Sequence, residues 1–101
     1  MTTKEQIAEF SEGLELFGVR VYPMMGDYVV YFDEKPVGCV CDNRLFIKET
    51  PVSRTLFGDC PMLPPYVGAK PRYLVENYDK AELAAKLSKV AAQLPAPKKK
   101  K

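Results

Sequence analysis

Two polar turns between short alternating apolar runs constrain this chain more than any other feature. Residues 22 to 48 read YPMMGDYVVYFDEKPVGCVCDNRLFIK. Tyr28, Val30 and Phe32 alternate with Val29, Tyr31 and Asp33. The chain then reverses at 33–36, and Asp42 and Asn43 mark a second reversal. Because Asp and Asn tolerate the left-handed backbone that tight hairpins need, the segment predicts three consecutive antiparallel strands. Nothing in it indicates catalysis.

Amphipathic helices are predicted on both sides of these strands. The first begins near Thr3, which has capping-box spacing with Gln6, and ends at Gly18. Its apolar stripe is formed by Ile7, Phe10, Leu14 and Phe17. The closing helix begins at Asp79 and ends before Pro95. Its stripe is formed by Leu83, Leu87, Val90 and Leu94. Each stripe places its apolar residues on one helix face, which must be buried against another layer.

The remaining segments predict two more strands and a short helix. Residues 19–24 form a strand whose Pro23 favours a sheet edge, and residues 51–57 form a helix with proline in its first turn. Residues 59–71 contain four prolines and a glycine and are predicted to be an irregular loop, before a last strand at 72–76.

These elements predict an α+β fold, a two-layer sandwich of an antiparallel sheet with helices packed on one face. The opposite sheet face should then carry much of Tyr22, Tyr28 and Tyr31. Residues 1–95 are expected to form a single domain, and residues 96–101 a disordered lysine-rich tail.

The charge is concentrated at the end of the chain. Of 15 basic residues, four form the tail, and without them 11 basic residues face 13 acidic ones. This mildly acidic balance argues against a broad phosphate-binding face. The tail lysines could contact nucleic acid weakly, and solubility is the competing explanation. These candidate nucleic-acid contacts are Lys98, Lys99, Lys100 and Lys101.

The composition disfavours export, membrane insertion and common catalytic chemistry. The first residues are charged and no apolar run spans a bilayer, so a cytoplasmic protein without a membrane partner is expected. The chain contains no histidine, the commonest general base and metal ligand. Its cysteines, Cys39, Cys41 and Cys60, lack a matched fourth ligand and should be reduced. We therefore expect no enzyme, catalytic residue, metal or cofactor.

Two groups of residues are candidates for binding. Met24 and Met25, followed by Tyr28, could form an adaptable apolar surface for a partner chain, and core filling is the alternative. Gly68 and Lys70 lie in a small loop that could bind an anion. The alternative is structural, because the same two residues would suit a tight turn that leads into the last strand. The loop also lacks the spacing of a phosphate-binding loop.

Several motifs, taken in order, resemble a known family. They are MMGDYVVY from Met24, KPVGCVCDNRLFIKET from Lys35, PYVGAKP from Pro65, and the lysine-ended tail. Together they resemble the short, stand-alone members of the TfoX amino-terminal-domain family. The resemblance covers most of the chain. It implies an α+β fold related to a bacterial competence regulator and a regulatory or protein-interaction role without enzymatic activity.

The resemblance also implies a class of partner. The full-length regulator acts with a cyclic-AMP receptor protein at competence promoters, so a transcription regulator is one expected partner. The regulator's second, helical domain has no counterpart within these 101 residues, which puts a competence role in doubt. A homodimer, weak nucleic-acid binding and a small-molecule or anion site remain open alternatives.

Overall fold

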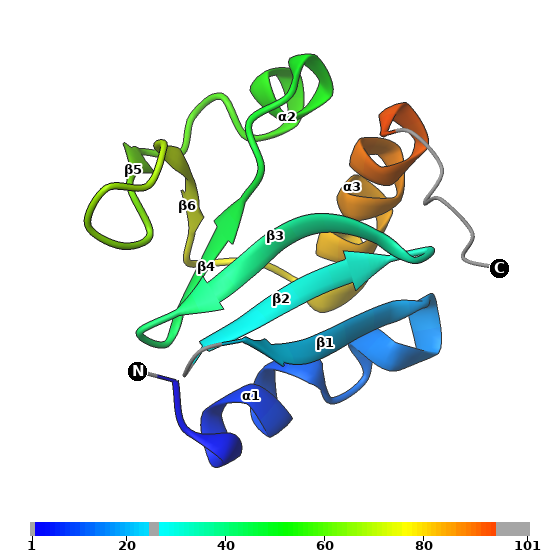
Figure 1. Ribbon diagram of the computed structural model, residues 1–101. Helices are drawn as coiled ribbons and strands as arrows, with labels where there is room; N and C mark the ends of the chain where they lie inside the picture. Colours follow the sequence, from blue (N-terminus) through cyan, green and yellow to red (C-terminus); the bar gives the residue numbers. More distant parts are fainter. Residues whose placement is uncertain (1, 25–26, 95–101) are drawn as a thin grey trace, which may run out of the picture.

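Two tight hairpins organise the sheet of the protein. The computed structural model describes residues 2–24 and 27–94. The strands are β1 (Val19–Met24), β2 (Asp27–Phe32), β3 (Lys35–Cys41), β4 (Arg44–Ile47), β5 (Met62–Leu63) and β6 (Arg72–Val75). They form one antiparallel sheet in the order β1-β2-β3-β4-β6-β5 (Figure 1). The helices are α1 (Lys4–Ser11), the 3-10 helix η1 (Leu14–Phe17), α2 (Pro51–Leu56) and α3 (Lys80–Gln93).

The two predicted reversals are present, and each is made by two residues with left-handed backbone. Asp42 and Asn43 have φ of 52° and 61°, as expected for the second turn. Asp33 and Glu34 have φ of 52° and 62°, so the first turn is shorter than the predicted 33–36, and Lys35 already belongs to β3. Two consecutive positive φ angles match the twist of the flanking strands and keep both hairpins tight.

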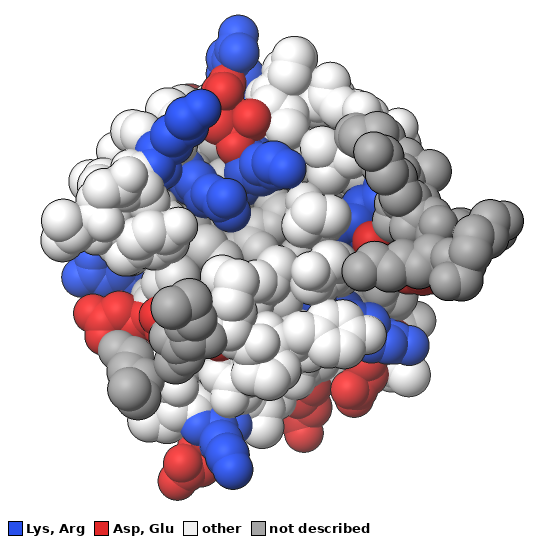
Figure 2. Space-filling view, viewed as in Figure 1, with Lys and Arg blue, Asp and Glu red and all other residues white. Residues whose placement is uncertain are grey.

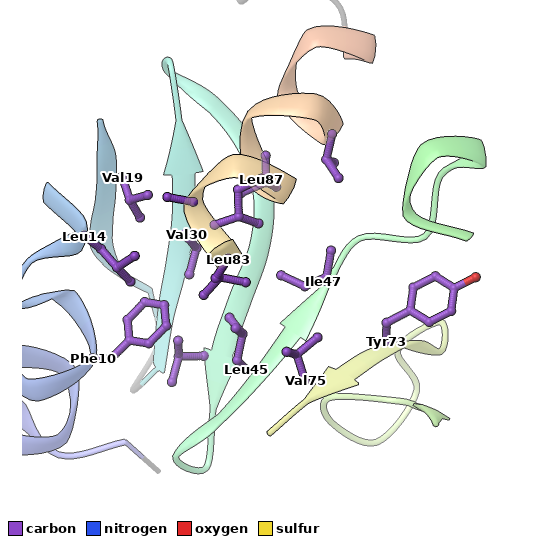
Figure 3. Close-up of a cluster of buried hydrophobic side chains, with 14 of the residues drawn as sticks. Phe10, Leu14, Val19, Val30, Leu45, Ile47, Tyr73, Val75, Leu83 and Leu87 are labelled. Carbon is purple, nitrogen blue, oxygen red and sulfur yellow. The ribbon is translucent and has the colours of Figure 1, made fainter. Parts of the chain in front are cut away.

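All of the described helices contribute to one core on one face of the sheet, which confirms the predicted two-layer α+β fold. In Figure 3, side chains of α3 point toward those of β2 and β4. Leu14, Val30 and Leu87 are each fully buried there. Both predicted helix starts are confirmed, because Thr3 and Gln6 form the capping box and the Asp79 carboxylate accepts from the Glu82 N–H at 3.1 Å.

Two predictions about local structure are wrong. The first helix is not continuous to Gly18, since Gly13 takes φ of 85° and the chain restarts as η1. This break leaves Phe17 48% exposed instead of in the apolar stripe. The 59–71 segment is not wholly irregular, because the two residues of β5 pair with β6 and supply a sheet edge despite the flanking prolines.

The strand register decides which tyrosines lie on the face opposite the helices, which we call the open face. On β1 and β2, Tyr22 pairs with Val29 and Arg20 pairs with Tyr31, so both tyrosines lie on the open face as predicted. Tyr28 does not, because its side chain packs against the helix-covered core. Tyr28 and Tyr31 are three residues apart, and an odd spacing in a strand reverses the face.

A polar network fixes the start of the chain against the second hairpin. The Asp27 Oδ1 atom accepts from the backbone N–H and the hydroxyl of Thr2, both at 3.2 Å, and from the Asp42 N–H at 3.1 Å. The Thr2 hydroxyl also accepts from the Asn43 N–H at 2.9 Å. The network holds Thr2 beside β2 and the turn between β3 and β4. Between residues 2 and 94, leaving out 25 and 26, no helix has the length and hydrophobicity to cross a membrane.

Candidate functional site

The open face carries a partly exposed aromatic pair on β1, an edge strand of the sheet, and on its neighbour β2. The rings of Tyr22 and Tyr31 meet edge to face, with centroids 5.3 Å apart and an angle of 80° between their planes. They line a hollow of about 220 Å³ together with Arg20 and Glu34. Met24 lies on the same face of β1 and is 46% exposed. We call these five residues the tyrosine patch.

The residues predicted for partner contact do not form one surface in the structure. Met24 is in the tyrosine patch, whereas Tyr28 packs against the core on the helix-covered side. Met25 and the lysines Lys98–Lys101 lie outside the described residues. Sequence reasoning placed Tyr22 and Tyr31 on the open face but did not propose them as contact residues. Their alternating positions on neighbouring strands were the signal that could have identified them.

A second candidate site is a groove of about 710 Å³ between α2 and the β5–β6 edge of the sheet. Four cationic side chains and one carboxylate, that of Glu49, line the groove. The four cations are Lys48, Arg54, Lys70 and Arg72. Figure 2 shows Lys and Arg atoms gathered around a hollow in the upper part of this view, with acidic atoms beside them. Met62, Pro71 and Tyr73 supply an apolar wall. We call this site the basic groove.

The predicted anion loop contributes to the basic groove through Lys70. Gly68 takes φ of 88° in a turn that the Ala69 N–H closes onto the Tyr66 carbonyl at 3.1 Å. The turn directs the chain into β6, so the structural role proposed for Gly68 is present, and Lys70 lies in the groove. Lys48, Arg54 and Arg72 were not predicted, because only the pairing of β4 with β6 brings their segments together.

A smaller hollow of about 320 Å³ lies between α1, the second hairpin and the segment before α3. Its charges are mixed, since Glu9 and Glu76 line it together with Arg44 and Lys80. The Lys80 ammonium already donates to the Glu9 carbonyl at 2.7 Å and to the Glu12 carbonyl. With its charges balanced in this way, the hollow has less capacity for a charged ligand than the basic groove.

Two of the three cysteines meet on the open face. The Cys41 thiol donates to Cys39 Sγ at 3.6 Å, and Arg72 Nη1 donates to the same sulfur at 3.8 Å. Burial raises the pKa of the Cys39 thiol, and burial together with the neighbouring Cys39 raises the pKa of Cys41 to about 12. Cys60 packs against the other face, with the main core. Within the described residues, no three His, Cys, Asp or Glu side chains form a metal-binding group.

These environments predict a clear order of thiol reactivity. Because the thiolate is the reactive form, a rise in pKa from 9.0 to about 12 leaves Cys41 with about a thousandfold less thiolate at neutral pH than an unperturbed thiol has. Burial also raises the pKa of Cys60, and the nearby charge of Lys86 opposes that shift. We expect iodoacetamide to alkylate the half-buried Cys60 first and to reach Cys39 and Cys41 only on unfolding. Mass spectrometry of time-resolved digests would measure this order. Labelling of Cys41 as fast as Cys60 in folded protein would contradict it.

Comparison with known proteins finds a relative whose name assigns it no function. No family model matches it. Over 85 residues it is 42% identical to the "Uncharacterized 12.7 kDa protein in trpE 5'region" of Spirochaeta aurantia, and the match covers 82% of this chain and 74% of that protein. The chain belongs to the family of that spirochaete protein. The similarity to the spirochaete protein is therefore close in sequence, and it assigns no activity to this chain.

Proposed function

We propose that the protein is a non-enzymatic, cytoplasmic regulatory or protein-interaction module of the kind that the TfoX resemblance implies. The observation that carries this proposal is the tyrosine patch, an aromatic pair on a sheet face where none of the described helices packs. Tyr22 is 55% exposed although it lies among strands whose other face is buried in the core.

The chemistry of the tyrosine patch suits a protein partner. Tyrosine buries a large area at low cost in conformational entropy and often dominates contact energy in interfaces. The hollow beside Tyr22 and Tyr31 could receive an apolar side chain, while Arg20 and Glu34 at its border could pair with opposite charges. The expected partner therefore presents an apolar anchor flanked by charged residues. A transcription regulator is the partner class that the family resemblance implies, and a second copy of this chain would satisfy the same chemistry.

Replacing Tyr22 with glutamate should abolish partner binding and leave the fold intact. Glutamate places a charge in the centre of the patch, and loss of a central aromatic contact typically weakens an interface by about 2 kcal/mol or more. The partner would be captured from the native cytoplasm, identified, purified and titrated against wild type and Tyr22→Glu, with circular dichroism to verify folding. Sedimentation of the protein alone would detect self-association.

Tyr66→Glu is the matched control, since Tyr66 is 61% exposed on the 59–71 loop and not in the tyrosine patch. We expect this variant to bind as wild type does. Binding that survives Tyr22→Glu but is lost in Tyr66→Glu would refute the assignment to the open face and place the contact on the loop.

A further inference from the structure

The basic groove concentrates positive charge in a domain that is otherwise acidic. Outside the four tail lysines the chain has 11 basic and 13 acidic residues. The groove takes four of the basic residues and one of the acidic ones, which leaves seven basic against twelve acidic elsewhere. The overall balance that argues against a broad phosphate-binding face therefore does not apply to this groove.

The cations of the groove are mostly without counter-charges. Glu49 is engaged by Arg54, whose Nε donates to its Oε2 at 2.6 Å. Among the described residues, the ammonium groups of Lys48 and Lys70 have no ion pair or hydrogen bond. Arg72 makes one long contact, to the Cys39 sulfur at 3.8 Å, and its remaining donors are not used by described groups. An anion would relieve the mutual repulsion of these cations and gain charge-assisted hydrogen bonds.

The size and lining of the groove indicate more than an isolated phosphate. A volume of about 710 Å³ is in the range of sites for small organic ligands. Met62, Pro71 and Tyr73 form an apolar wall beside the cations. Pro71 separates Lys70 from Arg72 in sequence, so charged and apolar contacts alternate along one side. A matching ligand would combine phosphate groups with a flat, partly apolar moiety.

We infer that the basic groove binds a phosphate-bearing small molecule of the nucleotide type, with its phosphates held by Lys48, Arg54, Lys70 and Arg72 and its base or equivalent ring against the apolar wall. This site is separate from the tyrosine patch and independent of the partner binding proposed above. It involves binding only, with no bond formed or broken.

Calorimetric titration of the 101-residue chain with ADP and with pyrophosphate would test the inference. We expect saturable binding of one ADP per chain, tighter than pyrophosphate because of the apolar wall, and weaker at raised ionic strength. Lys48→Gln and Lys70→Gln should each weaken ADP binding roughly tenfold or more, since each removes a charge-assisted contact. Lys70 is exposed, so its replacement should not disturb folding.

Lys89→Gln is the matched control, because Lys89 is exposed on α3 and its replacement removes the same charge away from the groove. Its ADP affinity should stay within about twofold of wild type, as for surface charges remote from a ligand. Equal weakening by Lys89→Gln and Lys70→Gln, or absence of ADP binding to wild type, would overturn the inference.

Two further experiments distinguish ADP binding in the basic groove from the binding of polyanions elsewhere on the chain. Glutamine at Lys98–Lys101 should preserve ADP binding, and loss of binding in this variant alone would assign it to the tail. A single-stranded oligonucleotide should compete with ADP no better than pyrophosphate does. If the oligonucleotide bound and ADP did not, the small-molecule assignment would be wrong.

Discussion

Gly38→Ala should unfold the protein or destabilise it by about 3 kcal/mol or more, at or above the upper end of the cost that overpacking usually carries. Gly38 lies in β3 opposite Ile47 of β4. A methyl group at this position would overlap the Phe46 carbonyl oxygen and lie 3.2 Å from Ile47 Cα. Both obstacles are backbone atoms of the paired strand, so relief requires β3 and β4 to separate. Chemical denaturation followed by circular dichroism would measure the loss.

Gly68→Ala provides the control for that experiment. No atom outside its neighbours lies within 4 Å of the added methyl group, but φ is 88°. The expected cost is only the backbone strain, about 1 kcal/mol. Equal free energies of unfolding for the two variants would show that the close approach of β3 and β4 is not what requires glycine at position 38.

Leu14→Ala should lower the free energy of unfolding by about 2–5 kcal/mol, whereas Leu16→Ala should change it by less than about 0.5 kcal/mol. Both leucines belong to η1, and they share chemistry and local backbone. Leu14 is fully buried in the main core, and Leu16 is 86% exposed. Comparing the two variants therefore separates the effect of burial on stability from the effect of helix propensity. Thermal and denaturant unfolding of the two variants would measure the difference, and a similar loss from both would contradict the described position of η1.

Local chemistry made the hairpins predictable. Asp42 and Asn43 are residues that accept left-handed backbone, and the required turn lies within two adjacent positions. The helix caps at Thr3 and Asp79 likewise depend on neighbours three residues away. Where the interacting groups are close in sequence, the pattern predicted the structure correctly.

Errors arose where structure depends on register or on a single backbone angle. The stripe from Ile7 to Phe17 has helical spacing throughout, but Gly13 reverses the sign of φ and moves Phe17 to the surface. The prediction for Tyr28 was wrong because Tyr28 and Tyr31 are an odd number of residues apart in β2, so their side chains lie on opposite faces of the sheet. The β2–β3 register also shifts between Val30 and Tyr31, a displacement that simple alternation does not reveal.

The basic groove was beyond sequence reasoning for a different physical reason. Only Lys70 was identified, from its small loop. Lys48 and Arg54 belong to the chain before that loop and Arg72 to the strand after it. The pairing of Phe46 with Leu74 brings these distant segments together. No local pattern encodes this pairing, which depends on the burial of β4 and β6 in the main core.

The strand order has a consequence for how the groove is assembled. Strands β1 to β4 follow one another along the chain, whereas β6 joins β4 only after residues 48–71 have closed into a large loop. Closing a long loop costs entropy before its contacts form. Lys48 and Arg54 lie near the start of this loop and Lys70 and Arg72 at its end, so the groove forms only when the loop closes. A ligand bound there would hold the two ends of the loop together. We expect the amide protons of β6 to exchange more slowly with deuterium when ADP is present.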